Sequence, residues 1–258
     1  MPRDLLTWEK AAKLNPLHWV GHYPLDLKRI KMEAMILARR LNFSRKHILL
    51  DMGCGVGLYN IFWSKVVREQ ILVDVSESML RMAKTFLGKS GANVHFINCD
   101  VRHLPIRDEC IYRCICLGVL KHLERNPIST FQAVREAGRT LKVGGKLYVS
   151  DLNIDFHVNA LVQRLIDFFR RMLGIFCVDV YFYRREDFEV IPTLLTKGKV
   201  IYQTYGWRFP LSDALVNIFP LRIRRALELL FKSKPRHLLS PTIVMYLYSN
   251  VELIYEKG

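Results

Sequence analysis

The stretch from Ile48 to Leu58 constrains this 258-residue chain more than any other, because it joins a strand signal to a run of glycines. Its aliphatic start predicts a buried strand that ends at Asp51. Three glycines follow at alternate positions: Gly53, Gly55 and Gly57. The apolar run 58–66 predicts a helix packed on the sheet. A strand, a glycine turn and a helix in this order bring the backbone close to a small ligand.

Two classes of ligand-binding turn compete for this stretch. A dinucleotide-binding turn has the spacing Gly-x-Gly-x-x-Gly. Here the third glycine, Gly57, comes one residue early, and Leu58 stands where the last dinucleotide glycine would be. Asp51 also lies two residues before the first glycine. This Asp-x-Gly-x-Gly-x-Gly spacing resembles motif I of the class I methyltransferases, which bind S-adenosyl-L-methionine.

A second buried strand, 71–73, ends in Asp74, where an acid can accept hydrogen bonds from both hydroxyls of a ribose. Ser76 then predicts the N-cap of a helix that places Met79, Ala83 and Phe86 on one face. The string Val-Asp-Val-Ser-Glu-Ser-Met-Leu at 73–80 resembles the second motif of the type-11 class I methyltransferases. The alternative is a surface acid without a ligand.

Two further strands, 94–98 and 111–117, carry the resemblance onward. It implies that Asp100 accepts from the adenine amine, that the Val101 N–H reaches the adenine ring, and that Leu117 and Gly118 lie near the cofactor. The expected cofactor-binding set, part of it read from the residues themselves, is Asp51, Gly53, Cys54, Gly55, Gly57, Asp74, Val75, Met79, Asp100, Val101, Leu117 and Gly118.

His122 follows the fourth strand and has two readings. It could act as a general base near the methyl acceptor, or it could brace the local structure, which is the reading we favour. Nearby thiols at Cys110, Cys114 and Cys116 raise the question of a metal. Their spacing lacks the paired Cys-x-x-Cys pattern of structural zinc, so buried thiols and no metal site are expected.

The motifs appear in family order between Ile48 and about Asn153. The resemblance implies an α/β fold of the Rossmann-like class I type, with a seven-stranded, mostly parallel sheet and helices on both faces. We expect one domain in three parts: an N-terminal helical segment or lid over 1–46, the cofactor-binding core over 47–153, and a C-terminal part over 154–258. A helix at 130–141 with a glycine C-cap at 144–145 and strands at 200–205 and 251–255 complete this prediction.

The formal charge of +15 has two equally weighted interpretations: an anionic partner, which would be RNA, DNA or an anionic membrane surface, or general solubility. Predicted helices at 156–175 and 211–231 interleave apolar residues with arginines: Arg164, Arg170, Arg171, Arg222, Arg224 and Arg225. These arginines either belong to a surface that faces the acceptor or a membrane, or lie on ordinary surface helices with solvated faces. Without an apolar run long enough to span a membrane or a signal-peptide pattern, the expected location is cytoplasmic, with peripheral membrane attachment as an option.

The resemblance implies an S-adenosylmethionine-dependent methyltransferase. The acceptor is unidentified. A small molecule, including a lipid or quinone, is favoured because an appended RNA-binding module is missing. A tRNA or rRNA methyltransferase is the first alternative. The second, of a different class, is a non-catalytic cofactor-binding subunit that regulates a partner. The oligomeric state and the atom that receives the methyl group stay open.

Overall fold

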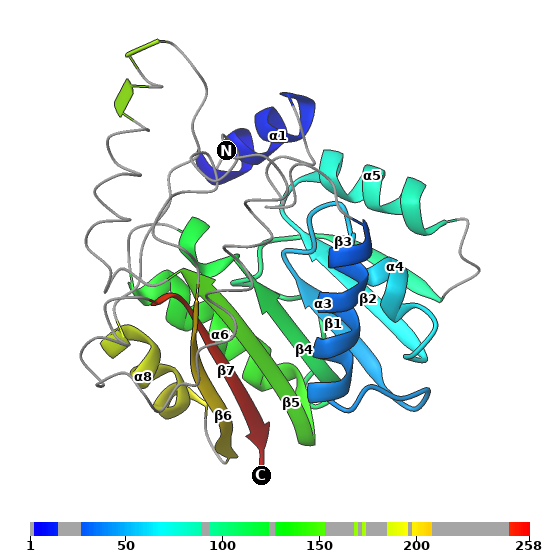
Figure 1. Ribbon diagram of the computed structural model, residues 1–258, viewed down its shortest axis with the longest axis vertical. Coiled ribbons are helices and arrows are strands. Elements are labelled where there is room, and N and C mark those ends of the chain that lie inside the picture. The colour runs from blue at the N-terminus through cyan, green and yellow to red at the C-terminus, as the bar shows by residue number, and fades with distance from the viewer. Residues whose placement is uncertain are drawn as a thin grey trace, which may run out of the picture.

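The computed structural model describes residues 3–14, 27–88, 93–123, 127–152, 168–169, 172–173, 185–195, 198–207 and 248–258 (Figure 1). The predicted helices at 156–175 and 211–231 fall largely or wholly outside these ranges. All six of their arginines also lie outside them. Within the N-terminal segment expected over 1–46, residues 1–2 and 15–26 lie outside them as well.

A seven-stranded sheet forms the centre, in the order β3-β2-β1-β4-β5-β7-β6. Its strands are β1 (Ile48–Met52), β2 (Glu69–Asp74), β3 (Val94–Asn98), β4 (Ile111–Leu117), β5 (Leu141–Leu152), β6 (Gly198–Trp207) and β7 (Tyr248–Lys257). The first five strands are mutually parallel, and β7 is antiparallel to both of its neighbours. Parallel neighbours need crossover connections, which place helices on the sheet faces. The class I fold expected from the sequence is therefore confirmed.

The helices are α1 (Arg3–Leu14), α3 (Leu27–Arg40), α4 (Asn60–Trp63), α5 (Glu77–Leu87), the 3-10 turn η1 (Leu120–His122), α6 (Pro127–Thr140) and α8 (Arg185–Leu194). The packing of alternate residues of β4 shows how these helices divide between the two faces of the sheet. Cys114 and Cys116 belong to a buried cluster that includes residues of α6. Ile115 belongs to a second cluster, which includes residues of α3. The sheet is thus buried on both faces, as its aliphatic strands require.

Helix α1 lies across one end of the sheet (Figure 1). Strand β7 runs toward the opposite end, where the C-terminus is marked. Because β5 is antiparallel to β7, the parallel strands end on the side of α1. Ligands of open α/β sheets bind at the carboxyl ends of the strands. The N-terminal helix therefore stands over the edge at which a ligand is expected.

Two predicted helix details were wrong. The helix expected over 58–66 is the single turn α4, since the chain must reach β2 at Glu69. The Trp63 indole N–H fixes this turn by donating to the Ala34 carbonyl at 2.9 Å. On α5, Phe86 does not share the buried face, and 44 % of it is exposed. Leu87, four residues after Ala83, points inward instead.

The glycine C-cap expected after α6 was also wrong. Strand β5 begins at Leu141, directly after the helix ends at Thr140. Leu141 pairs with Ile111, and the register then shifts so that Arg113 pairs with Lys146. The residues between, including Gly144 with φ of 72°, form an irregularity within the strand. Burial of Leu141 in the sheet accounts for the early start of the strand.

Candidate functional site

The three glycines after β1 form a turn that only glycine accommodates easily. Gly53, Gly55 and Gly57 have φ of 71°, 54° and 69°, in the left-handed region. The turn is tied to β2, because the Gly53 and Cys54 N–H groups donate to the Val73 carbonyl at 2.7 and 3.0 Å. A Cβ built on Gly53 would lie 2.4 Å from the Val119 Cγ2. The glycine turn is therefore pressed against the segment that follows β4.

Asp74 holds this turn in place from the end of β2. Its Oδ2 accepts from the Gly55 N–H at 2.8 Å, and its Oδ1 accepts from the Ser76 N–H at 2.9 Å. The Asn98 amide adds support by donating to the Asp74 carbonyl at 3.0 Å. Burial raises the pKa of the Asp74 carboxyl to about 6, although the hydrogen bonds from Ser76 and Gly55 favour the charged form. Each oxygen keeps capacity for a further donor, such as a ribose hydroxyl.

Asp51 is a second buried acid at the same edge, at the end of β1. Burial raises the pKa of its carboxyl to about 7, and the charge of Asp74 acts in the same direction. A hydrogen bond from Asn60 partly opposes this shift. Burial and the two nearby carboxylates also raise the pKa of the Cys54 thiol. Two crowded, desolvated acids are stabilised when a cation binds beside them.

Asp100 follows β3 and has a partner that the sequence reasoning missed. Arg102 Nε lies 3.0 Å from its Oδ1 and 2.9 Å from its Oδ2, while Arg102 Nη2 donates at 2.5 Å. Burial alone would raise the pKa of the Asp100 carboxyl, but the hydrogen bonds and charge of Arg102 outweigh it and lower the pKa. Asp100 is thus a fixed carboxylate, and Arg102 sets its direction. An arginine two residues after a candidate acid is the signal that could have revealed this pair.

The other predicted cofactor-binding residues divide into two groups. Gly118, with φ of 63°, stays at the strand ends, and its N–H donates to the Ser150 carbonyl at 2.8 Å. Val75 and Leu117 are half-buried there. Met79 and Val101, in contrast, bury their side chains in hydrophobic clusters. A contact from Val101 would therefore involve its backbone, as the sequence analysis expected.

His122 ends the turn η1, and its ring makes an edge contact with Trp8 of α1, with centroids 4.7 Å apart. Of the three thiols considered for a metal, Cys114 and Cys116 are buried, and burial raises the pKa of both. The Cys114 thiol donates to the Met52 sulfur at 3.4 Å. Within the described residues, no group of three or more His, Cys, Asp or Glu side chains is placed to hold a metal ion.

These features fit a cationic nucleoside ligand. The glycine turn lets backbone approach a ligand without a Cβ in the way. Asp51 and Asp74 favour positive charge, and Asp74 and Asp100 offer carboxylate acceptors at neighbouring strand ends. S-adenosyl-L-methionine combines a sulfonium and an ammonium cation with ribose hydroxyls and an adenine amine. The residues present therefore suit this cofactor, and Asp51, Asp74 and Asp100 are the side chains that would hold it.

Comparisons with known proteins agree with this geometry. A family model described as a methyltransferase domain matches residues 50–149. Ubiquinone biosynthesis O-methyltransferase of Coxiella burnetii is 28 % identical over 149 residues, and the match covers 58 % of this chain and 58 % of that protein. A ubiquinone/menaquinone biosynthesis C-methyltransferase of Vibrio cholerae is 34 % identical over 113 residues, or 41 % of each chain. The match thus spans little more than half of the length of the first relative and less than half of the length of the second.

Solved structures show the same fold at low identity. Geranyl diphosphate C-methyltransferase from Streptomyces coelicolor, in complex with S-adenosyl-L-homocysteine, aligns with a TM-score of 0.59 and 12 % identity, covering 88 % of this chain and 79 % of that one. The [4+2]-cyclase SpnF aligns with a TM-score of 0.64 and 15 % identity, covering 100 % and 97 %. The matched domain over residues 50–149, the relatives and the shared fold make this chain similar to the class I S-adenosylmethionine-dependent methyltransferases.

Proposed function

We propose that this protein transfers a methyl group from S-adenosyl-L-methionine to a small, lipophilic acceptor of the quinone type. The cofactor part of this proposal rests on one observation. The Gly53–Gly57 turn, Asp74 and Asp100 lie at the ends of three adjacent parallel strands. When bound, the cofactor supplies a methyl group already activated on a cationic sulfur. The chain's own work is to orient the two reactants and to exclude water.

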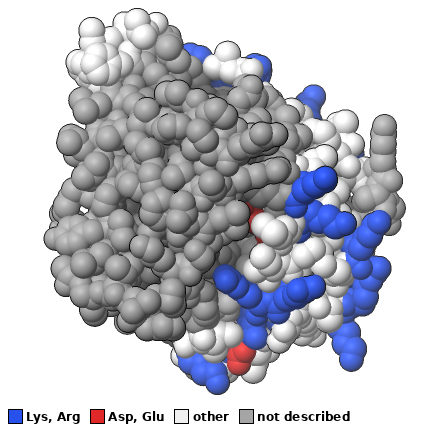
Figure 2. Space-filling view, in the orientation of Figure 1, with Lys and Arg blue, Asp and Glu red and all other residues white. Residues whose placement is uncertain are grey.

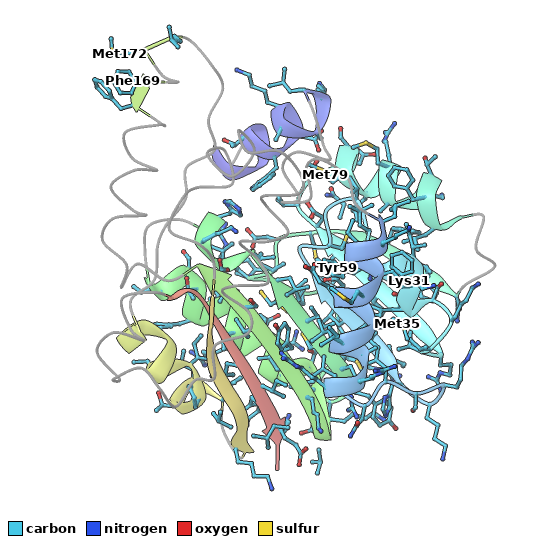
Figure 3. The ribbon with its side chains drawn as sticks, in the orientation of Figure 1. Lys31, Met35, Tyr59, Met79, Phe169 and Met172 are labelled. Carbon is cyan, nitrogen blue, oxygen red and sulfur yellow. The ribbon has the colours of Figure 1, made fainter. Side chains whose placement is uncertain are left out.

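The acceptor class rests on two observations of different kinds. The curated relatives are named for ubiquinone and menaquinone biosynthesis. About two thirds of the way along the chain, large apolar side chains are between 57 % and 74 % exposed: Phe168, Phe169, Met172 and Leu173. Phe169 and Met172 lie well away from the sheet (Figure 3). Exposed apolar residues near arginines in the sequence, here Arg170 and Arg171, are typical of segments that rest on an anionic membrane surface.

The basic surface supports the same setting. Helix α3 carries exposed Lys31, Arg39 and Arg40. In the part of Figure 2 that is not grey, Lys and Arg side chains clearly outnumber Asp and Glu. Such a surface is attracted to anionic lipid headgroups. Among the described helices, none is long and apolar enough to cross a membrane. Peripheral attachment to a bilayer is therefore the form of membrane contact that we propose.

Two measurements test the proposal. In the first, the protein is incubated with methyl-labelled S-adenosylmethionine and a fractionated cell extract, with the Asp74→Ala variant as control. Label in the lipid fraction, lost in the variant, supports the proposal. Label in RNA would replace it with the RNA methyltransferase alternative. Tight S-adenosylhomocysteine binding without label in any fraction would favour the regulatory-subunit alternative.

The second measurement is sedimentation with vesicles of phosphatidylglycerol and phosphatidylcholine. The protein should sediment with anionic vesicles at low salt. Exchange of Phe168, Phe169, Met172 and Leu173 for serine should weaken this binding while leaving cofactor affinity unchanged. The matched control exchanges exposed Ile128 for serine. Equal vesicle binding by all three proteins would remove the membrane from the proposal but leave the methyltransferase assignment intact.

A further inference from the structure

Helix α1 contacts parts of the candidate site that are far apart in sequence. Ala12 belongs to a buried cluster with Val56 and Leu58, which flank the last glycine of the turn, and with Met79 of α5. Figure 3 shows Met79 on the side of α5 that faces α1. Helix α1 therefore packs directly on the elements that frame the candidate cofactor site.

The polar contact of α1 is made by Glu9. Its Oε1 accepts from the Ser76 hydroxyl at 2.8 Å and from the Ser78 N–H at 3.1 Å. Its Oε2 accepts from the Ser78 hydroxyl. Burial alone would raise the pKa of the Glu9 carboxyl, but hydrogen bonds from Ser78 and Ser76 outweigh it and lower the pKa. A charged carboxylate thus sits at the N-terminus of α5, where it is favoured by the helix dipole.

This contact adjoins the cofactor-binding acid. Ser76, which donates its hydroxyl to Glu9, donates its N–H to Asp74. The charge of Glu9 is close enough to contribute to the raised pKa of Asp74. On the other side of the site, Trp8 rests on the ring of His122, which follows β4. Neighbouring residues of α1 thus bridge the ends of β2 and β4, with β1 and the glycine turn between them.

We propose that α1 is a gate over the cofactor site, and that Glu9 is the positioning residue that latches it to Ser76 and Ser78. This proposal rests on the proposed function, since it assumes that S-adenosylmethionine and its product exchange at this edge. Closed, the gate shields the site from water and forms one wall of the acceptor pocket with Trp8 and His122. Opening requires that the three hydrogen bonds of Glu9 break together, so the latch sets the rate of ligand exchange.

Stopped-flow measurement of S-adenosylhomocysteine binding tests the gate. In Glu9→Ala, the association and dissociation rate constants should both rise, by roughly tenfold as hydrogen bonds to a charged group are lost. The dissociation constant should change by much less. This pattern distinguishes a gate from a direct ligand contact, because the loss of a ligand contact would accelerate dissociation alone. Lys13→Gln, an exposed change in the last turn of α1, is the matched control and should leave both rates unchanged.

Ser78→Ala approaches the same latch from α5 and leaves α1 intact. It should accelerate both rates in the same direction, and the double variant Glu9→Ala/Ser78→Ala should be less than additive, as expected for groups in contact. Unchanged rates in both single variants, or a rise confined to dissociation, would overturn the gate. If the parent does not bind S-adenosylhomocysteine at all, the proposed function fails first, which is a separate result.

Discussion

Replacement of Asp74 by alanine should separate cofactor binding from folding. In the ligand-free protein, the surroundings raise the pKa of this carboxyl from 3.8 to about 6. At pH 7.5 the buried charge is therefore disfavoured by about 3 kcal/mol, since one pKa unit corresponds to about 1.4 kcal/mol. Its removal relieves that cost, but it leaves the N–H groups of Gly55 and Ser76 without their acceptor.

Each unsatisfied N–H costs about 1–3 kcal/mol when it is buried. The net change in the free energy of unfolding should thus lie between a gain of about 1 and a loss of about 3 kcal/mol. For cofactor binding, the loss of the Asp74 carboxylate is not offset by relief of a buried charge. A ribose hydroxyl that loses a charged acceptor forfeits about 1.5–3 kcal/mol, which weakens S-adenosylhomocysteine roughly ten- to a hundredfold.

Isothermal titration calorimetry with S-adenosylhomocysteine measures the affinity, and urea unfolding measures the stability. Asp108→Ala is the control, because Asp108 is exposed and pairs with Arg139 at 2.5 Å, away from the glycine turn. This variant should bind as the parent does. A folded Asp74→Ala protein with parental affinity would refute the role of Asp74 as the ribose acceptor.

Three further predictions concern the same site. Gly55→Val should remove detectable S-adenosylhomocysteine binding while the circular dichroism spectrum keeps its shape, since φ of 54° strains a β-branched residue; binding at parental strength would exclude the turn as the site. The affinity for S-adenosylhomocysteine should rise between pH 5.5 and 7.5, because Asp51 and Asp74 lose their protons with pKa values of about 7 and 6. The unfolding free energy of the ligand-free protein should instead fall over about pH 4–7, because raised pKa values favour the protonated folded state. Calorimetry and urea unfolding at several pH values check both trends, and flat profiles would contradict them. Arg102→Ala should weaken binding up to about tenfold, because Asp100 loses the guanidinium that orients it; the same titration tests this, and unchanged affinity would argue against Asp100 as an adenine contact.

The central parallel strands were predictable because their signal is local. Val94–Asn98 and Ile111–Leu117 have the bounds expected from their apolar runs. Ser76 also caps α5 as expected, with its hydroxyl oxygen accepting from the Met79 N–H at 3.2 Å. In each case, neighbouring residues determine the outcome through burial or a hydrogen bond within a few positions. The wider ladder of β6 with β7 extends beyond the short runs that suggested these strands.

The missed features depend on contacts between distant residues. Glu9 reaches Ser78 across 69 positions, and no periodicity in either segment signals that pair. The start of β5 is decided by the pairing of Leu141 with Ile111 on another strand. The paired state of Asp100 depends on the direction of the Arg102 side chain, which sequence spacing leaves undetermined. Local patterns therefore locate the candidate site, while its closure and its charge balance come from tertiary contacts.

The position of β7 has a consequence for the order in which the protein can be assembled during synthesis. This strand follows β6 in the chain, yet it lies between β5 and β6 in the sheet. At about 5–20 residues per second, roughly 5–20 s separate the synthesis of Leu152 from that of Tyr248. Throughout that interval the edge of β5 lacks the partner that Leu253 and its neighbours later provide. An unpaired strand edge is a template for pairing with another chain, so this interval is when the nascent protein is most exposed to association with another copy.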